Sequence, residues 1–429
     1  MTRLRGVASH TFRSIRTRNF RYYFVGQIVS AVGSWIQVVA QAWLVLDLAH
    51  DGIALGITMA CQFTPVLLGG AWAGAVVDRL DKRKLMVRTA TASGVLATML
   101  GVLAVTGVVH VWMVWVIAFL SGCVNAIDTP ARRSFVTELV PRSEASNAIS
   151  LNSAVFTGAR AVGPAIAGLL IASIGVAWCF LANGASFIAV IAALLLMRPS
   201  ELYAPIPVRR EKRQVREGLE YVWRTPAVRL ALGMVLVLGI FAFNYQVQIP
   251  LLARRGFHAG PEAFGLLFIA LSIGSLAGAL VAAHRTRSDI RLMVSSALLL
   301  GIAFAAAGLA PSLTIELLVL VPLGYFGMVF LAMATAVCQE DTRPELRGRV
   351  MALFSVAFMG TTPIGGPIVG AVADAVGARA SMGVGALGSV AAAVVAAVAL
   401  RRRAAAAPAA DQAPEGPPVA AAPTPSAAA

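Results

Sequence analysis

The hydrophobic positions of this chain form long runs, and the charged positions are confined to short segments between them. Two of the runs without Asp, Glu, Lys or Arg, 89–127 and 161–197, are too long for one membrane-spanning helix of about 20 residues. We divide the first near 107–110 and the second at Gly175, and we place Arg160 within a span. The pattern predicts twelve helices, near 20–46, 53–77, 85–107, 111–128, 147–173, 177–197, 228–251, 263–284, 291–310, 313–337, 350–373 and 379–400.

The composition excludes a soluble protein. Hydrophobic residues make up 58% of the chain and charged residues 13%, against about 25% charged in an average soluble domain. This charge is too sparse to cover the surface of a soluble fold. We therefore expect an all-α, multi-pass membrane protein.

The basic residues predict an orientation. Of the 35 Lys and Arg residues, only Arg254, Arg255 and Arg379 lie in loops on one side, and Arg160 lies within a span. All others lie on the opposite side, which the positive-inside rule makes cytoplasmic. We expect both termini in the cytoplasm and the protein in a bacterial cell (inner) membrane.

A basic segment divides the spans six and six. Its stretch RREKRQVREGLEYVWRTP is typical of an amphipathic helix on the membrane face. The Ala/Pro-rich end of the chain predicts a disordered tail. The expected parts are a basic N-terminus (1–19), a six-helix bundle (20–197), the central loop (198–227), a second six-helix bundle (228–400) and the tail (401–429).

The two halves share a pattern. Pro141 corresponds to Pro344, and the pair Gly163–Pro164 corresponds to Gly366–Pro367 at the same offset. Because each half has six spans, the repeats have the same orientation, as in transporters whose halves are related by an axis along the membrane normal. We expect the two bundles to surround a central cavity.

The loop after the second span reads GAVVDRLDKRK. It resembles the Gly-x-x-x-Asp-Arg-x-Gly-Arg-Arg loop of the major facilitator superfamily, with Asp81 at the usual second glycine. The resemblance implies a cytoplasmic gate, and the alternative is a simple positive-inside anchor. The gate residues would be Gly74, Asp78, Arg79, Lys82 and Arg83.

The fifth span reads GARAVGPAIAG, with Gly158, Gly163, Pro164 and Gly168. It resembles the Gly-Pro motif of the antiporters of this superfamily, although Gly168 comes one position late. The alternative is a kinked helix contact without a role in coupling. Together with TPARRSFVTELVPRSEASNAISLNS and RPELRGRVMALFS, it resembles the enterobactin-exporter-like branch, or transmembrane secretion effectors, over residues 10–402. That resemblance implies export of a small molecule driven by protons.

Polar residues within the spans are candidates for a substrate cavity. Placing the charge of Arg160 in lipid would cost roughly 2.5–3.5 kcal/mol, so we expect the side chain to face a cavity or a partner. It would bind cargo or modulate a nearby carboxylate. The alternative is that it donates hydrogen bonds to backbone carbonyls near Pro164. Five polar residues at helical spacing lie on one face of the first span, and the seventh span contains three further polar residues. We expect the two sets to form opposite walls of the central cavity. The alternative is that they form hydrogen bonds between helices. These residues are Gln27, Ser30, Ser34, Gln37, Gln41, Asn244, Gln246 and Gln248.

Four acidic residues near span ends are candidates for proton coupling: Asp128, Asp47, Glu316 and Asp374. Each is also compatible with an interface charge. Asp128 ranks first because Arg132 and Arg133 follow it closely.

No nucleotide-binding P-loop, intramembrane histidine cluster or nucleophilic triad occurs, so we expect neither an enzyme nor a metal or cofactor site. The energy source would be a proton gradient. The leading hypothesis is a monomeric proton antiporter that exports small amphipathic molecules, drug- or siderophore-like, and binds no nucleic acid. The alternatives are an importer or uniporter of the same fold, and a non-transporting membrane scaffold or receptor.

Overall fold

The computed structural model describes residues 13–77, 79–203, 214–285 and 288–406, and all structural statements below refer to these. Within them, twelve helical segments are long and apolar enough to cross a membrane. This confirms the all-α fold and the predicted number of spans. Asp78, the start of the chain, part of the central loop and the predicted tail from residue 407 lie outside the described residues.

The first six spans are single helices. They are α2 (Arg18–Ala49), α3 (Gly52–Val77), α4 (Lys82–Val105), α5 (Val111–Glu138), α6 (Ala145–Ile174) and α7 (Val176–Leu196). Three short 3-10 turns, η1 (Arg13–Arg16), η2 (Arg142–Glu144) and η3 (Pro199–Glu201), flank them. Helix α5 continues about ten residues past the predicted end of the fourth span, so Asp128 lies inside the helix rather than at its end.

The other six spans follow the short helix α8 (Gln214–Arg224). The seventh comprises α9 (Pro226–Phe241), α10 (Tyr245–Leu251) and the π-helical turn η4 (Leu252–Gly256). Then come α11 (Pro261–Ala283), α12 (Ile290–Leu309), α13 (Leu313–Glu340), α14 (Arg347–Met359) with α15 (Thr362–Ala375) as one span, and α16 (Ala378–Ala406).

Two spans predicted as continuous are broken. Between α14 and α15 the break lies at Gly360–Thr361, where Pro363 has no amide hydrogen to continue the ladder. Between α9 and α10, the Asn244 side chain donates to the Ile240 carbonyl at 2.7 Å and satisfies a group that the broken helix leaves open. Both breaks are local, so each pair of helices still forms one span.

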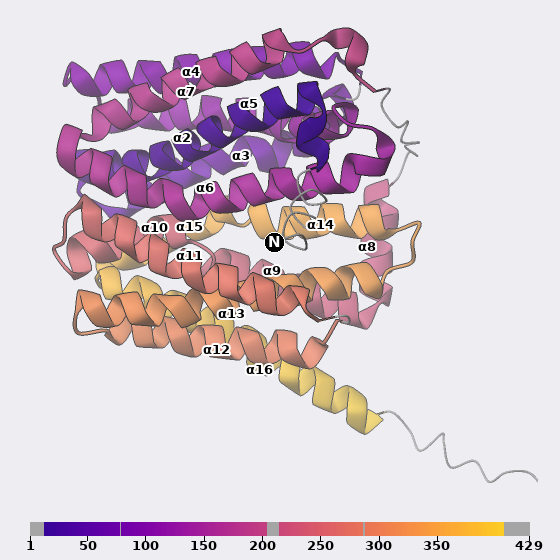
Figure 1. Cartoon of the computed structure of the whole chain (residues 1–429). Coiled ribbons are helices and arrows are strands. Elements are labelled where there is room, and N and C mark those ends of the chain that lie inside the picture. Colours follow the sequence, from indigo (N-terminus) through magenta and orange to yellow (C-terminus); the bar gives the residue numbers. More distant parts are fainter. Residues whose placement is uncertain (1–12, 78, 204–213, 286–287, 407–429) are drawn as a thin grey trace, which may run out of the picture.

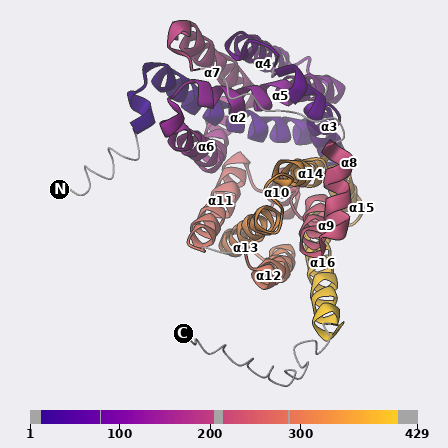
Figure 2. The same cartoon turned by 90° about the vertical axis from the view of Figure 1, so that its right-hand side faces the viewer.

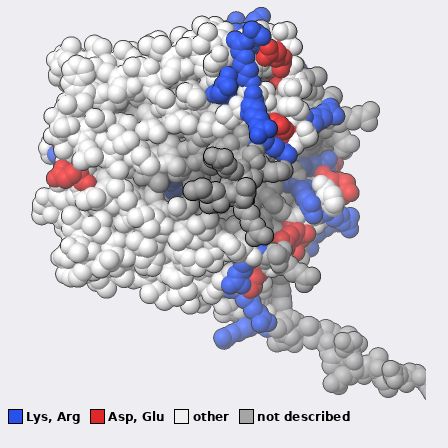
Figure 3. Space-filling view, viewed as in Figure 1, with Lys and Arg blue, Asp and Glu red and all other residues white. Residues whose placement is uncertain are grey.

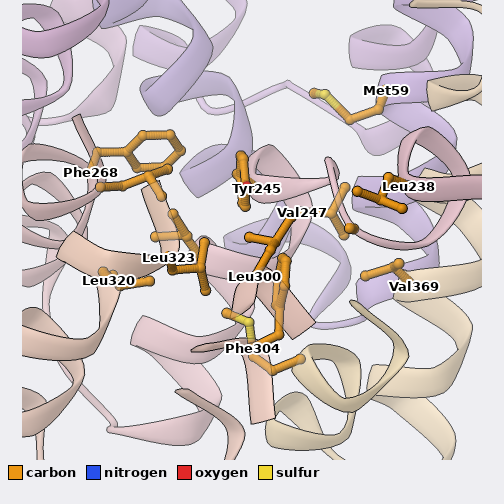
Figure 4. Close-up of a cluster of buried hydrophobic side chains, with 14 of the residues drawn as sticks. Met59, Leu238, Tyr245, Val247, Phe268, Leu300, Phe304, Leu320, Leu323 and Val369 are labelled. Atoms are coloured by element: carbon orange, nitrogen blue, oxygen red, sulfur yellow. The ribbon is translucent and has the colours of Figure 1, made fainter. Parts of the chain in front are cut away.

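The helices form two bundles that lie side by side (Figures 1 and 2). The first contains α2–α7 and the second α9–α16. Aromatic and aliphatic side chains fill the second bundle, including Tyr245, Leu300, Phe304 and Leu323 (Figure 4). The ring of Tyr245 stacks on that of Phe304, with 6.0 Å between centroids.

Charged side chains gather at one end of the molecule (Figure 3). We call this the basic end. The first described residue, Arg13, and the end of α16 both lie there. The other end, which carries Arg254, Arg255 and Arg379, is called the opposite end. Helix α8 lies at the basic end against the second bundle, where Tyr221 donates a 2.9 Å hydrogen bond to the Asp341 carbonyl.

The two bundles meet toward the opposite end through closely approaching helices. Gly56 of α3 packs against α15, where a Cβ on Gly56 would lie 2.5 Å from the Gly366 oxygen. Gly168 of α6 packs against α11, where its Cβ would lie 3.4 Å from the Cα of Gly265. These small residues allow the backbones to approach.

Toward the basic end the bundles separate. Nothing lies within 4 Å of a Cβ built on Gly158 of α6 or on Gly70 of α3. On the same half of α6, Ser153 and Thr157 are exposed. The structure is therefore closed at the opposite end and open toward the basic end.

Candidate functional site

The polar stripe of the first span lines a cavity inside the first bundle. This cavity, here called the polar chamber, has a volume of about 190 Å³ and is also bordered by α3, α4, α5, α6 and α7. All five predicted stripe residues lie on its wall. Its polar lining consists of Gln27, Ser30, Ser34, Gln37, Gln41, Gln62, Ser93, Ser121, Asn125, Asp128, Arg132 and Asn183.

Asp128 lies in this chamber, and residues of α4 and α5 bind its carboxylate. Arg132, one turn later on α5, forms an ion pair with Asp128, and its other nitrogen donates to Gln27 Oε1 of α2 at 3.0 Å. Thr89 of α4 donates a 2.7 Å hydrogen bond to the second oxygen of Asp128. The Arg132 guanidinium lies 5.1 Å from the ring centroid of Phe156 on α6. The carboxylate is thus compensated by one charge and one hydroxyl.

A second cavity, about 650 Å³, lies between α5 and α6 toward the basic end. Thr129, Arg133, Asn152 and Ser153 are among its lining residues. We call it the α5–α6 cavity. Asn125, Arg132 and Phe156 line both cavities, so these side chains form the wall between them.

The span-7 residues do not face the stripe across one cavity. Gln248 is buried in the second bundle and donates to the Ser381 carbonyl of α16 at 3.0 Å. Asn244 is buried at the α9–α10 break, and Gln246 is half-buried. The expected opposite walls therefore belong to different environments: the stripe faces the interior of the first bundle, and two of its three expected partners face that of the second.

Arg160 lies midway along α6 and is exposed, so it faces an accessible space. Its guanidinium lies 5.7 Å from the ring centroid of Trp35 on α2. Tyr245 of α10 in the other bundle lies within electrostatic range of this guanidinium. The structure therefore places Arg160 between the bundles and apart from the lining of the polar chamber.

Asp47 takes part in a contact between the bundles at the opposite end. It forms an ion pair with Arg254 of η4, and Arg254 also lies 5.2 Å from the ring centroid of Trp43. Neighbouring Arg255 donates to the backbone carbonyl of His50 at the end of α2. Both arginines of this turn therefore bind the first bundle.

Asp374 caps a helix of the other bundle. Its carboxylate accepts hydrogen bonds from the Gly52 amide at 2.7 and 2.9 Å and from the Ile53 amide at 2.8 Å, at the start of α3. Arg255 forms an ion pair with the same carboxylate. We call the contacts of Asp47, Arg254, Arg255 and Asp374 the opposite-end latch, because they join the bundles where the structure is closed.

Glu316 is fully buried near the start of α13. Neither of its carboxylate oxygens has a hydrogen-bond partner among the described residues. The positive charge of Arg379 acts on it. Glu316 and Asp128 are therefore both buried carboxylates, and Asp128 lines the polar chamber.

The gate-loop residues make contacts within the first bundle. Lys82 forms a 2.7 Å ion pair with Glu138 at the end of α5. Arg83 donates to the carbonyls of Leu194 and Leu195 at the end of α7, at 2.7 and 3.1 Å. Gly74 lies near the end of α3, and Arg79 is exposed. In this open arrangement these cations bind the ends of neighbouring helices.

The Gly-Pro motif of the fifth span lies where α6 meets other helices. A Cβ on Gly163 would collide with Trp35 of α2, and the carbonyl of Pro164 lies 2.9 Å from a Cβ position on Gly265 of α11. Gly168 faces α11 as well, whereas Gly158 faces open space. The motif thus permits the contact that closes the opposite half.

Several chamber residues were not singled out from the sequence. Ser93, Phe156 and Asn183 each come from a different helix, and Asn183 donates to Gln37 Oε1 at 2.5 Å. The sequence feature that could have identified them is a single polar residue within an apolar run, as at Asn183 and Gln62. Among the described residues, no group of three His, Cys, Asp or Glu side chains is arranged to hold a metal ion.

Comparison with known proteins agrees with this architecture. The family model described as transmembrane secretion effector matches residues 9–426. The chain belongs to this family of major facilitator transporters. It is accordingly a multi-pass membrane transporter rather than an enzyme.

Several characterised relatives cover most of the chain. The staphyloferrin A transporter of Staphylococcus aureus is 25% identical over 83% of this chain and 90% of its own length. The multidrug efflux pump Tap of Mycolicibacterium fortuitum is 29% identical over 82% and 89%, respectively. Macrolide efflux protein A of Streptococcus pyogenes is 24% identical over 83% and 90%.

Solved structures share the fold. A bacterial homologue of the lysosomal transporter Spinster, in an inward-facing form, has a TM-score of 0.66 at 15% identity, over 90% of this chain and 96% of its own. A POT family transporter in complex with 5-aminolevulinic acid has a TM-score of 0.71 at 12% identity, over 91% and 97%.

Proposed function

We propose that this protein exports small amphipathic molecules across a bacterial cell membrane in exchange for protons. The observation that carries the proposal is the Asp128–Arg132 pair within the first bundle. Charged side chains at membrane depth are costly and usually serve a transport or proton pathway. This pair lies at the wall between the polar chamber and the α5–α6 cavity. A change in the charge of Asp128 therefore changes the electrostatic environment of both cavities.

The orientation follows from charge. With the basic end in the cytoplasm, as the positive-inside rule favours, the open half of the structure faces the cytoplasm. The closed half with its latch then faces outward. This is the arrangement from which an exporter takes up its cargo.

The cargo class is inferred from the relatives and from Arg160. Relatives are named for a siderophore, for several drugs and for macrolides. In this chain, Arg160 over Trp35 offers a cation and an aromatic face in the space between the bundles. We infer that this pair contacts a polar or anionic group on an otherwise apolar molecule.

Asp128 would carry the proton. In its charged form it is bound by Arg132 and Thr89. When a proton binds a carboxylate oxygen, the ion pair loses its attraction, and Arg132 keeps Gln27 and the Phe156 ring as partners. Because α5 and α6 each contribute to this cluster, protonation changes the balance of contacts between two helices that border the α5–α6 cavity.

The test is ethidium efflux from loaded cells, or ethidium accumulation in inside-out vesicles, with and without a protonophore. Wild-type efflux should stop when the protonophore is added. Asp128→Asn should lose efflux driven by a proton gradient by at least tenfold while keeping ethidium exchange without a gradient. The control Asp289→Asn changes a carboxylate that caps α12 at the basic end and should keep both activities.

Arg160→Ala should weaken transport of anionic or polar probes more than that of ethidium, which is a cation. Efflux that ignores both the protonophore and Asp128→Asn would exclude proton exchange through this residue. Ethidium uptake in place of efflux would favour an importer.

A further inference from the structure

Two cavities of different character meet at one wall in the first bundle. The polar chamber lies inside the bundle, and the α5–α6 cavity lies toward the basic end. Arg132 and Phe156 stand between them, with the guanidinium 5.1 Å from the ring centroid. Asp128, paired with Arg132, lines the chamber and is absent from the lining of the α5–α6 cavity.

The chamber is suited to water. Its wall is rich in carboxamides and hydroxyls, and Gln41 Nε2 is buried on it without a hydrogen-bond partner among the described residues. Buried polar groups of this kind are satisfied by internal water when the cavity is large enough, as this one is. From Gln27 to Gln41 the stripe extends roughly 21 Å along α2, at 1.5 Å per residue. It therefore leads from Asp128 toward the opposite end.

The chamber is poorly suited to an amphipathic cargo. Sites for drug-sized ligands usually have volumes of about 300–1,000 Å³ and predominantly apolar walls. The chamber, at about 190 Å³, is smaller and its lining is largely polar. The accessible space beside Arg160 between the bundles is the better place for cargo.

We propose that the polar chamber is a separate proton route to Asp128, and that Phe156 with Arg132 is the partition that keeps it from the α5–α6 cavity. This rests on the proposed function for the identity of the proton acceptor. A proton passes from chamber water to a carboxylate oxygen of Asp128 and leaves to water on the other side of the partition. Cargo crosses between the bundles. The proton route and the cargo route are therefore coupled by movement of the helices and not by a shared binding site.

The groups around Asp128 and Arg132 come from four elements. Arg132 on α5 is the charged one, Tyr23 on α2 is near enough to interact with both charges, and Thr89 on α4 donates a hydrogen bond. Phe156 on α6 contributes only its ring. Removing Phe156 therefore opens the partition without removing a charge or a hydrogen bond from the acceptor.

The experiment uses the full chain in liposomes that contain a pH-sensitive dye, with a pH gradient and no cargo. Phe156→Ala should raise the passive proton flux at least tenfold over wild type. Phe119→Ala is the matched control, because Phe119 lies on α5, the helix of Asp128, but is 45% exposed and lines neither cavity. It should leave the flux unchanged, and Phe156→Ala with Asp128→Asn should return the flux to the wild-type level.

A second pair of variants tests the route by filling it. Ser93→Leu places a larger side chain in the chamber, while Thr91→Leu changes the outer face of the same helix. Ser93→Leu should reduce proton-driven ethidium efflux at least tenfold and spare ethidium exchange; Thr91→Leu should spare both.

The outcomes separate this proposal from the proposed function. The separate route would be wrong if the wild type shows proton-driven efflux, Phe156→Ala has the passive proton flux of wild type, and Ser93→Leu keeps proton-driven efflux. Proton-coupled export would then still stand. A leak that persists in Phe156→Ala with Asp128→Asn would overturn the passage through Asp128. Because the leak is measured without cargo, it remains decisive even if ethidium is not transported.

Discussion

At the scale of single residues, the Asp128–Arg132 pair shows how a membrane bundle accommodates two charges. Each charge has the other as its main compensation, with Thr89 and Gln27 as neutral partners. Removing one partner of a buried pair leaves an uncompensated charge and costs about 3–5 kcal/mol, whereas replacing both by apolar groups is often neutral. The pair should therefore behave as a unit.

We expect Arg132→Leu to lower the stability of the purified protein by about 3 kcal/mol. Arg132→Leu with Asp128→Leu should recover most of this loss, because no lone charge remains. Thermal unfolding in detergent, followed by circular dichroism, measures both. Arg198→Leu is the control, since Arg198 pairs with Glu201 at the surface, where such pairs contribute at most about 1 kcal/mol. A double variant as unstable as Arg132→Leu would contradict the argument.

The sequence identified Asp128 and the stripe but not their surroundings. Helical spacing shows that Gln27, Ser34 and Gln41 share a face, and it carries no information on which helices that face meets. The expectation that Gln248 faces the stripe across one cavity is therefore not met, because Gln248 donates to the Ser381 carbonyl inside its own bundle. Thr89 could not be assigned either, since a threonine in an apolar run is equally compatible with a bond to its own helix.

At the scale of elements, the span boundaries follow from hydropathy, and the breaks within spans do not. The charge-free run 350–373 predicts one helix, yet the chain breaks at Gly360–Thr361 because Pro363 has no amide hydrogen to continue the ladder. The charged residues after Asp128 suggested the end of a span, yet α5 continues to Glu138, whose carboxylate pairs with Lys82. The helix thus continues past its apolar part to a residue that forms a tertiary ion pair.

The contact between α3 and α15 depends on glycine. A Cβ on Gly56 would lie 2.5 Å from the Gly366 oxygen and 2.6 Å from the Cα of Pro367. Gly56→Val should therefore force these helices apart and open the opposite end. Gly69→Val, on the same helix, should leave the bundles in place, because nothing lies within 4 Å of its Cβ position.

Spin labels measure this movement. Leu169 of α6 and Val376 after α15 belong to different bundles and are 67% and 75% exposed, so a label on each, in a background without the four native cysteines, reports the distance across the opposite end. Gly56→Val should lengthen the main distance relative to the unmodified and Gly69→Val proteins. An unchanged distribution would show that the α3–α15 approach does not hold the bundles together.

At the scale of the whole molecule, closure at the opposite end combines apolar packing with charge. The glycine contacts of α3 with α15 and of α6 with α11 bring the bundles together, and the opposite-end latch joins them by ion pairs and a helix cap. Within the latch, Asp374 of one bundle caps α3 of the other. A carboxylate at a helix N-terminus is stabilised by free amides and by the helix dipole. Separation of the bundles must expose both ends of this contact to water.

Asp374→Ala should therefore shift the equilibrium between the closed and open opposite end. Hydrogen bonds to a charged group contribute about 1.5–3 kcal/mol each, and part of that is recovered from water, so we expect roughly a tenfold rise in the open population. The same pair of spin labels measures it. Asp289→Ala removes the cap of α12 within one bundle and should cost some stability without changing the distance. If Asp289→Ala opened the opposite end as much as Asp374→Ala, loss of a cap in general would explain the shift, and the latch would have no specific part in closure.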